Sequence, residues 1–211
     1  MKRLVIVGAG GFGREMCAAA RESAVPGGGT FEVAGFLDAD PAALDRFSGY
    51  PPILGAPETY VPCPDDIFIT ALGDTEARRR CAAVVAARGG EFATLVHRTA
   101  SIGSNVALGP GSFVAAGASI TVDVSIGAHV CIFHNSSIGH DARILDFAHV
   151  YAQCAIGGGV VIGEGARVYP GSVVAPRRKI GAGAVVGACS AVFADVRPGA
   201  TVLGNPAMEL K

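Results

Sequence analysis

A histidine followed directly by an aspartate, His140-Asp141, is the pair in this 211-residue sequence whose chemistry is most readily stated. An imidazole can take a proton from an amine or hydroxyl group near neutral pH. A neighbouring carboxylate can fix its tautomer and strengthen it as a base. The pair lies within residues 138–143, just before an expected corner of the chain. A lone histidine there would be a solvated surface group, and the adjacent carboxylate favours a general base instead.

A second candidate site is the glycine-rich turn Gly8-x-Gly10-x-x-Gly13, which follows the apolar stretch Leu4–Val7. Glycines let the backbone approach a diphosphate, which then sits on the N-terminus of the following helix. Asp38, at the end of the next expected strand, is placed to meet a ribose or a base edge. Fewer than about 100 residues cannot build both halves of a dinucleotide site, which favours one nucleoside diphosphate over NAD. A tight turn without any ligand is the alternative.

The element that must position His140-Asp141 is indicated by a repeat of six residues. Every sixth residue from Val96 to Val192 is aliphatic, without interruption. These residues are Val96, Ile102, Leu108, Val114, Ile120, Ile126, Ile132, Ile138, Ile144, Val150, Ile156, Ile162, Val168, Val174, Ile180, Val186 and Val192. The residue four positions after each is small or of modest size, except Arg178.

A helix cannot carry this repeat, because at about 100° per residue a step of six winds over every face. In an extended chain a step of six keeps every marked residue on one side. The pattern predicts short parallel strands stacked into a solenoid over residues 96–197. The glycine that often follows the aliphatic residue, as in Ile102-Gly103, is expected to supply positive φ at the bends.

Residues 1–95 alternate between expected strands and helices, which indicates a small parallel α/β domain, half of a Rossmann-like fold. We expect strands at Leu4–Val7, Phe31–Leu37 and Ile67–Leu72, and helices up to about Glu22 and over Thr75–Arg88. The proline-rich stretch 51–64 is expected to be a loop. Residues 96–211 form the second domain.

Composition excludes several classes of partner. The formal net charge of −1 gives no electrostatic basis for binding nucleic acid or an anionic membrane. The apolar runs are too short for a membrane span, and glycines interrupt the N-terminal run before it could form a signal peptide. The six cysteines lack paired spacing. We therefore expect reduced cysteines and a cytoplasmic protein.

The six-residue repeat and the ending Gly204-Asn205-Pro206-Ala207 resemble the hexapeptide acyltransferase superfamily. The resemblance implies a left-handed parallel β-helix of triangular section. Over nearly the whole chain the sequence is similar to the bacterial nucleotide-amino-sugar N-acetyltransferases, such as those for bacillosamine and perosamine, and to the sialic acid O-acetyltransferases. It rests on the glycine turn, residues 36–38 and 71–74, Ile138-Gly139-His140-Asp141, and residues 146–149.

This resemblance implies acetyl transfer from acetyl-CoA, without a metal, to the amino group of a nucleotide-linked amino sugar. His140 would be the general base and Asp141 its partner. His149 would lie beside the acetyl carbonyl, and the Gly158 N–H would help to hold the thioester oxygen. The nucleotide part of the acceptor would be bound by a further set of residues: Gly10, Gly11, Phe12, Asp38 and Gly73.

Two positions depart from the family pattern. Phe12 stands where relatives often have histidine, and Phe133 where they often have asparagine. Both positions touch the acceptor in relatives, so the identity of the acceptor stays open. The basic run Arg177-Arg178-Lys179 is interpreted either as a contact for the phosphates of CoA or as a solvated, bulged turn. Tyr151 and Tyr169 would either line the pantetheine groove or cap a corner.

Other classes of function explain less of the sequence. β-helix carbonic anhydrases bind a metal through three histidines, but the spacing of His134, His140 and His149 does not match theirs. A non-catalytic scaffold would not need the His-Asp pair, and O-acetylation of a sugar remains the main competitor within the enzyme class. We also expect a homotrimer, because Phe133, Tyr151 and Leu145 are expected to face outward on the prism.

Overall fold

The computed structural model describes residues 1–25 and 30–210. The chain divides into two compact units, Met1–His97 and Arg98–Lys211. The first contains a parallel sheet with helices and the second is a β-solenoid, so the expected fold class is confirmed. None of the helices in the described residues is long and apolar enough to cross a membrane.

The first unit is a five-stranded sheet in the order β4-β3-β1-β5-β6, and all neighbouring strands are parallel. The elements are β1 (Lys2–Val7), α1 (Gly11–Ala20), β3 (Phe31–Leu37), β4 (Ile53–Gly55), β5 (Asp66–Thr70), α2 (Thr75–Ala87) and β6 (Glu91–Phe92). A short antiparallel pair, β2 (Ser23–Ala24) and β7 (Leu95–His97), is not part of this sheet. The prediction of a loop over residues 51–64 is wrong for β4, which pairs with β3 as an edge strand of the sheet.

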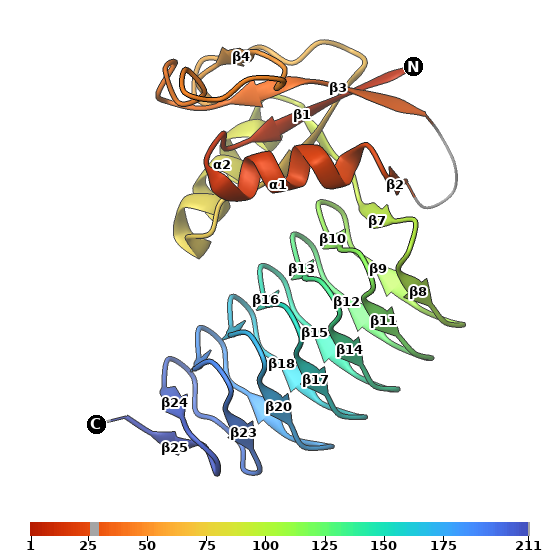
Figure 1. Ribbon diagram of the computed structural model, residues 1–211, viewed down its shortest axis with the longest axis vertical. Helices are drawn as coiled ribbons and strands as arrows, with labels where there is room; N and C mark the ends of the chain where they lie inside the picture. Colours follow the sequence, from red (N-terminus) through yellow and green to blue (C-terminus); the bar gives the residue numbers. More distant parts are fainter. Residues whose placement is uncertain (26–29, 211) are drawn as a thin grey trace. The chain divides into compact units, whose positions relative to one another are not determined.

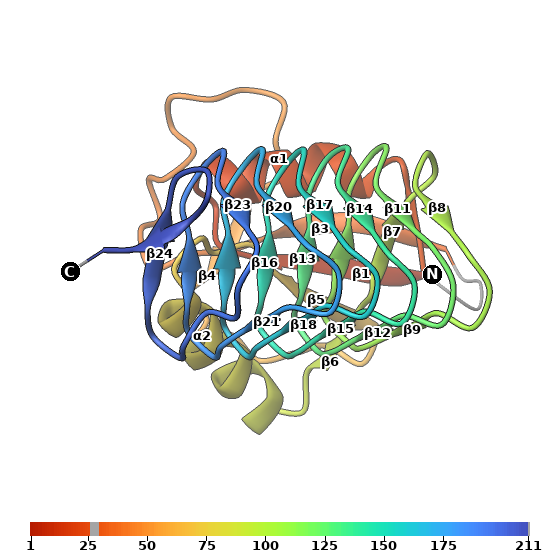
Figure 2. The ribbon, with the colours of Figure 1, turned by 90° about the horizontal axis from the view of Figure 1, so that it is seen from below.

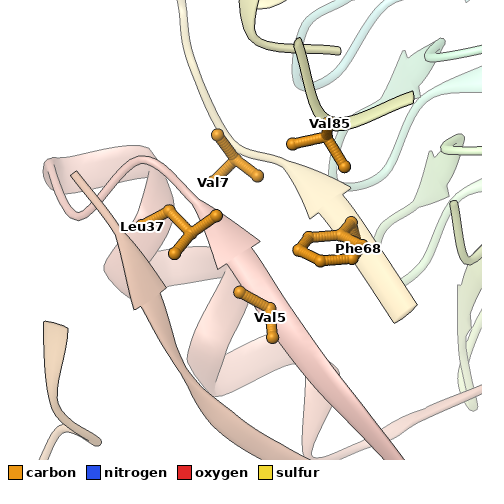
Figure 3. Close-up of a cluster of buried hydrophobic side chains, with 5 residues drawn as sticks. All are labelled: Val5, Val7, Leu37, Phe68 and Val85. Carbon is orange, nitrogen blue, oxygen red and sulfur yellow. The ribbon is translucent and has the colours of Figure 1, made fainter. Parts of the chain in front are cut away.

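The central strand β1 has no exposure from Leu4 to Val7, because it is paired on both edges and covered on both faces. Figure 3 shows side chains of three strands and α2 meeting in this core. They are Val5, Val7, Leu37, Phe68 and Val85. This packing holds the carboxyl ends of β1 and β3, and therefore the glycine turn and Asp38, next to each other.

The second unit winds through three sheets of very short strands, stacked coil on coil (Figures 1 and 2). One sheet contains β8 (Ser101–Ile102), β11 (Ser119–Ile120), β14 (Ser137–Ile138), β17 (Ala155–Ile156), β20 (Val173–Val174) and β23 (Ala191–Val192). The next contains β9 (Ala107–Leu108), β12 (Ser125–Ile126), β15 (Arg143–Ile144), β18 (Val161–Ile162) and β21 (Lys179–Ile180). The third runs through β10 (Phe113–Val114), β13 (Cys131–Ile132), β16 (His149–Val150), β19 (Arg167–Val168), β22 (Val185–Val186), β24 (Thr201–Leu203) and β25 (Met208–Glu209).

The aliphatic residues of the repeat form the core of the solenoid. Every member from Val114 to Val192 is buried. Paired residues are 18 apart, as in Ile120↔Ile138, so equivalent side chains of successive coils stack directly. Ile102, in the first coil, is 37% exposed. Burial of these residues therefore depends on neighbouring coils, as in other repeat proteins.

The expected role of the glycine after each aliphatic residue is wrong. These glycines do not have positive φ, which occurs three residues after the aliphatic residue, at positions such as Asn105, Asp123 and Asp141. A Cβ atom on Gly139 would instead lie 2.6 Å from the backbone nitrogen of Gly158 in the next coil. Glycine is needed there because successive backbones approach too closely for a side chain.

The basic run does not interrupt the solenoid, so the interpretation as a bulged turn is wrong. Lys179 pairs in register with Val161, and the carbonyl of Arg178 accepts a hydrogen bond from the Val161 N–H at 3.0 Å. The Arg178 side chain, at a position otherwise held by small residues, reaches Asp195 with Nη1 3.7 Å from Oδ1. An ion pair at the surface thus accommodates the large residue.

Candidate active site

His140 and Asp141 form a direct pair on the surface of the solenoid. His140 Nδ1 lies 2.7 Å from Asp141 Oδ2, and the two side chains are 67% and 66% exposed. Asp141 has a φ of 60°, the left-handed region that aspartate adopts more readily than most residues. This bend turns the carboxylate back toward the preceding imidazole. With Nδ1 engaged, Nε2 is the nitrogen left to exchange a proton with a substrate.

The backbones of the two neighbouring coils support this pair. The Gly159 N–H donates to the carbonyl oxygen of His140 at 2.7 Å, and the Asp141 N–H donates to the carbonyl oxygen of Val122 at 3.3 Å. The imidazole packs over Gly158, because a Cβ atom there would lie 2.6 Å from His140 Nε2. The imidazole of His140 therefore occupies the space that a side chain at position 158 would fill.

The Gly158 N–H has no acceptor among the described residues, whereas the N–H of the next residue, Gly159, donates to the carbonyl oxygen of His140. It belongs to the glycine whose Cα lies under the imidazole. The structure therefore brings together three predicted site residues: the base, its carboxylate and a backbone donor. A donor fixed beside a base is the arrangement that stabilises an oxyanion formed during acyl transfer.

His149 lies elsewhere on the coil. It is in β16, on the third sheet, whereas His140 follows β14 at the corner that leads to β15. Its side chain has no exposure, and its Nδ1 lies 3.4 Å from the hydroxyl oxygen of Tyr151. A single chain therefore places the two imidazoles on different sides of the solenoid. The predicted contact of His149 with the acetyl group stays a prediction.

An aromatic column, Phe133-Tyr151-Tyr169, runs beside His149. The rings of Phe133 and Tyr151 stack with centroids 5.2 Å apart, and those of Tyr151 and Tyr169 with centroids 4.9 Å apart. Phe133 is only 9% exposed, so it does not provide the exposed aromatic surface on which the expectation of a trimer rested. The two tyrosines pack on each other and do not cap separate corners. Their spacing of 18 residues, one full coil, is the signal that would have predicted this column.

In the first unit, the glycines around the turn after β1 fall into two classes. A Cβ atom on Gly13 would collide with the carbonyl of Gly8, and Gly8 itself has a φ of 105°. These two glycines are required by the fold. At Gly10 and Gly73, in contrast, a Cβ atom would meet nothing within 4 Å, and at Gly11 only Arg14 Nη2 at 3.9 Å. Packing within the protein therefore does not require glycine at the positions predicted to bind the acceptor, and open space lies next to them.

Asp38 anchors the glycine turn. Its Oδ2 accepts a hydrogen bond from the Ala9 N–H at 2.8 Å, and its Oδ1 accepts one from the Asp40 N–H at 3.0 Å. Asp38 itself is held at the end of β3, where its N–H donates to the carbonyl of Gly55. The carboxylate therefore shapes the turn, and its predicted contact with a nucleoside stays a prediction. Phe12 is partly buried in the first turn of α1.

Two other chemistries have little support at this site. The thiol of Cys154, in the coil of His140, is buried, and this burial raises its pKa to about 11. A thiol protonated at neutral pH is a poor nucleophile for a covalent acyl intermediate. Among residues 1–25 and 30–210, no group of three His, Cys, Asp or Glu side chains is arranged to hold a metal ion.

Comparison with known proteins identifies the two units. Residues 3–85 match the PglD N-terminal domain family, and residues 135–169 and 159–194 match the bacterial transferase hexapeptide family. Together these matches cover more than half of the chain. Among curated proteins, none matches the chain significantly by sequence.

Solved structures resemble the chain over its whole length. The acetyltransferase domain of PglB from Neisseria gonorrhoeae is 26% identical, with a TM-score of 0.86, and each chain is covered completely. PerB from Caulobacter crescentus, in complex with CoA and GDP-perosamine, is 28% identical, with a TM-score of 0.85 and coverage of 100% of this chain and 98% of that one. A mutant of perosamine N-acetyltransferase from the same organism, also with CoA and GDP-perosamine, is 27% identical with a TM-score of 0.89 and the same coverage. The chain is therefore an acyltransferase that combines an N-terminal domain of the PglD family with hexapeptide repeats of the bacterial transferase type.

Proposed function

We propose that this protein transfers the acetyl group of acetyl-CoA to the amino group of a nucleotide-linked amino sugar, with His140 as general base. The observation that carries this proposal is the exposed His140-Asp141 pair. His140 Nδ1 lies 2.7 Å from Asp141 Oδ2, and the imidazole packs over Gly158. The similar structures named above include N-acetyltransferases that bind CoA and GDP-perosamine. Their bound ligands support the choice of donor and acceptor class.

The chemistry follows from the groups present. The acceptor amine attacks the acetyl carbon in its neutral form, and its nitrogen becomes positively charged as the bond forms. His140 Nε2 would take the proton that this nitrogen must lose. The Gly158 N–H would stabilise the oxygen of the tetrahedral intermediate. Collapse breaks the carbon–sulfur bond, and the proton held on His140 passes to the departing thiolate of CoA. Asp141 would hold the imidazole in one tautomer throughout.

The first unit would hold the nucleotide. The open space at Gly10 and Gly11 and the free N-terminus of α1 suit a diphosphate, which helix N-termini bind through backbone N–H groups. Gly73 leaves similar open space after β5. We further propose that the protein is cytoplasmic, because its six cysteines are all free, as expected in a reducing compartment.

Free thiol release from acetyl-CoA tests the proposal directly. The purified protein should release CoA only with an acceptor, and UDP-, GDP- and dTDP-linked 4-amino sugars form the first panel. The matched controls are the same sugar nucleotides with a hydroxyl in place of the amino group. Turnover with the amino sugars alone supports N-acetylation. Turnover with the hydroxyl sugars alone would replace this proposal with O-acetylation, and no turnover with either set would contradict it.

A further inference from the structure

Arg14 is a cation for which residues 1–25 and 30–210 provide no counter-ion. It lies in the first turns of α1, and no acidic residue occurs in the first turn of that helix. The buried Nε of Arg14 has no hydrogen-bond partner, and no carboxylate among the described residues lies within ion-pairing distance of its guanidinium. A positive charge near a helix N-terminus is unfavourable, because the helix dipole is positive at that end.

The position of this guanidinium is well defined. Its Cζ lies 3.5 Å from the centre of the Phe47 ring, so the ring supports one face of the group. Its Nη2 lies beside Gly11: a Cβ atom built on Gly11 would be 3.9 Å from Nη2. The side chain therefore turns back toward the start of its own helix, where the open glycine turn lies.

The other helix of this unit shows the usual arrangement. At the start of α2, Asp74 accepts a hydrogen bond from the Ala77 N–H at 2.7 Å, and Glu76 lies in the first turn. At the start of α1, the N-cap residue is Gly10, without a side-chain cap. The first turn of α2 thus contains an acidic residue, whereas α1 has none there and has Arg14 instead. The carboxylate of Asp38 bonds the Ala9 N–H, before the N-cap of α1. An external anion would satisfy both the α1 backbone N–H groups and Arg14.

We infer that Arg14 binds the diphosphate of the acceptor, with Phe47 holding the guanidinium in place. This inference rests on the proposed function, which supplies a nucleoside diphosphate at the glycine turn. A guanidinium can donate two parallel hydrogen bonds to a phosphate, and stacking on an aromatic ring restricts it to one plane. Arg14 is therefore a residue that recognises the phosphates, while the nucleobase is recognised elsewhere.

Isothermal titration calorimetry on the full chain tests this assignment. The probes are UDP, GDP and dTDP, each compared with its uncharged nucleoside. Arg14→Met keeps an unbranched side chain over Phe47 but removes the charge and the donors. For the diphosphate that the wild-type protein binds, this change should raise Kd about 10- to 100-fold, as expected for charge-assisted hydrogen bonds. The Kd of the nucleoside should change less than about 2-fold, since it lacks the phosphates that Arg14 contacts.

Three controls make the result specific. Arg14→Lys keeps the charge without the planar fork and should lie between the wild type and Arg14→Met. Arg21→Met, at the other end of α1, should bind the diphosphate as the wild type does. Acetyl-CoA should bind every variant with unchanged affinity, which also shows that the variants are folded.

The outcomes separate this inference from the proposed function. Equal losses for diphosphate and nucleoside, or no loss for either, would overturn the role of Arg14 while the wild-type protein still binds nucleotide. A wild-type protein that binds none of the three diphosphates would overturn the proposed acceptor class, and the inference with it.

Discussion

Replacing Gly158 by alanine should reduce the turnover of this protein without reducing its stability. The added Cβ would lie 2.6 Å from Nε2 and 2.7 Å from Cε1 of His140. The crowded atoms belong to the far end of one flexible side chain that is 67% exposed, so the imidazole can move into solvent. Gly158 does not adopt a left-handed backbone conformation, and alanine is therefore tolerated by the chain itself.

The size of the effect follows from these distances. Non-bonded carbon and nitrogen atoms need about 3.5 Å, so the imidazole must retreat by about 0.9 Å or rotate away. A displacement of about 1 Å in a catalytic group can cost about 10²-fold in rate. Alanine also restricts the unfolded chain, which is worth about 0.4–1 kcal/mol where the backbone accepts it. We therefore expect kcat to fall about 100-fold while the melting temperature stays constant or rises slightly.

Steady-state thiol release and thermal unfolding, measured on the same preparations, check both halves of this prediction. Gly183→Ala is the matched control, because a Cβ there meets nothing within 4 Å, although the φ of 66° makes alanine strained. This control should lose stability and keep its kcat. In the His140→Ala background, Gly158→Ala should have little further effect, since the clash no longer exists. Normal turnover in Gly158→Ala would refute the argument that His140 must lie over this glycine.

His140→Ala should lower kcat by about 10²–10⁴-fold, the usual contribution of a positioned general base. Asp141→Ala should lower kcat less, because the carboxylate only orients the imidazole. A near-normal kcat of His140→Ala at neutral pH would exclude His140 as the general base. Asp38→Ala frees the Ala9 N–H and should raise KM for the sugar nucleotide at unchanged KM for acetyl-CoA, whereas Asp38→Asn keeps an acceptor oxygen and should retain most of the affinity. A rise in KM for acetyl-CoA instead would mean that the two ligands are assigned to the wrong units. Sedimentation equilibrium should show a trimer, because His140 and His149 lie on different sides of one solenoid and can share a site only between chains. A fully active monomer of 21.3 kDa at nanomolar concentration would contradict that model.

Much of the fold is predictable from the sequence because the solenoid repeats one local rule. A period of six is enough to predict the strands and which of their residues face inward. The pairing of residues 18 apart, as in Ile120↔Ile138, also requires three strands per coil, which the family resemblance implies. The glycine turn after β1 is predictable for a similar reason, since a strand, a turn and a helix follow each other directly in the chain.

The sequence-based predictions are wrong at positions whose structure depends on contacts between coils. The glycine after each aliphatic residue, as at Gly139, is required by the backbone of the next coil, which a reading of single bends does not include. Arg178 fits the repeat because Asp195 pairs with it from the following coil. Phe133 is buried in a column of rings one coil apart and is therefore not an exposed aromatic residue.

The fold class, the family resemblance and the pair His140-Asp141 can be predicted from the sequence, because adjacent residues and a strict period need no information about distant parts of the chain. Three other features become visible only in the folded chain: Gly158 makes room for the imidazole, Asp38 holds the glycine turn, and Arg14 has no counter-ion among the described residues beside that turn. Each of these depends on which atoms meet across coils, strands and loops. Side chains that are far apart in the sequence meet only when the folded chain brings them within a few ångströms of one another.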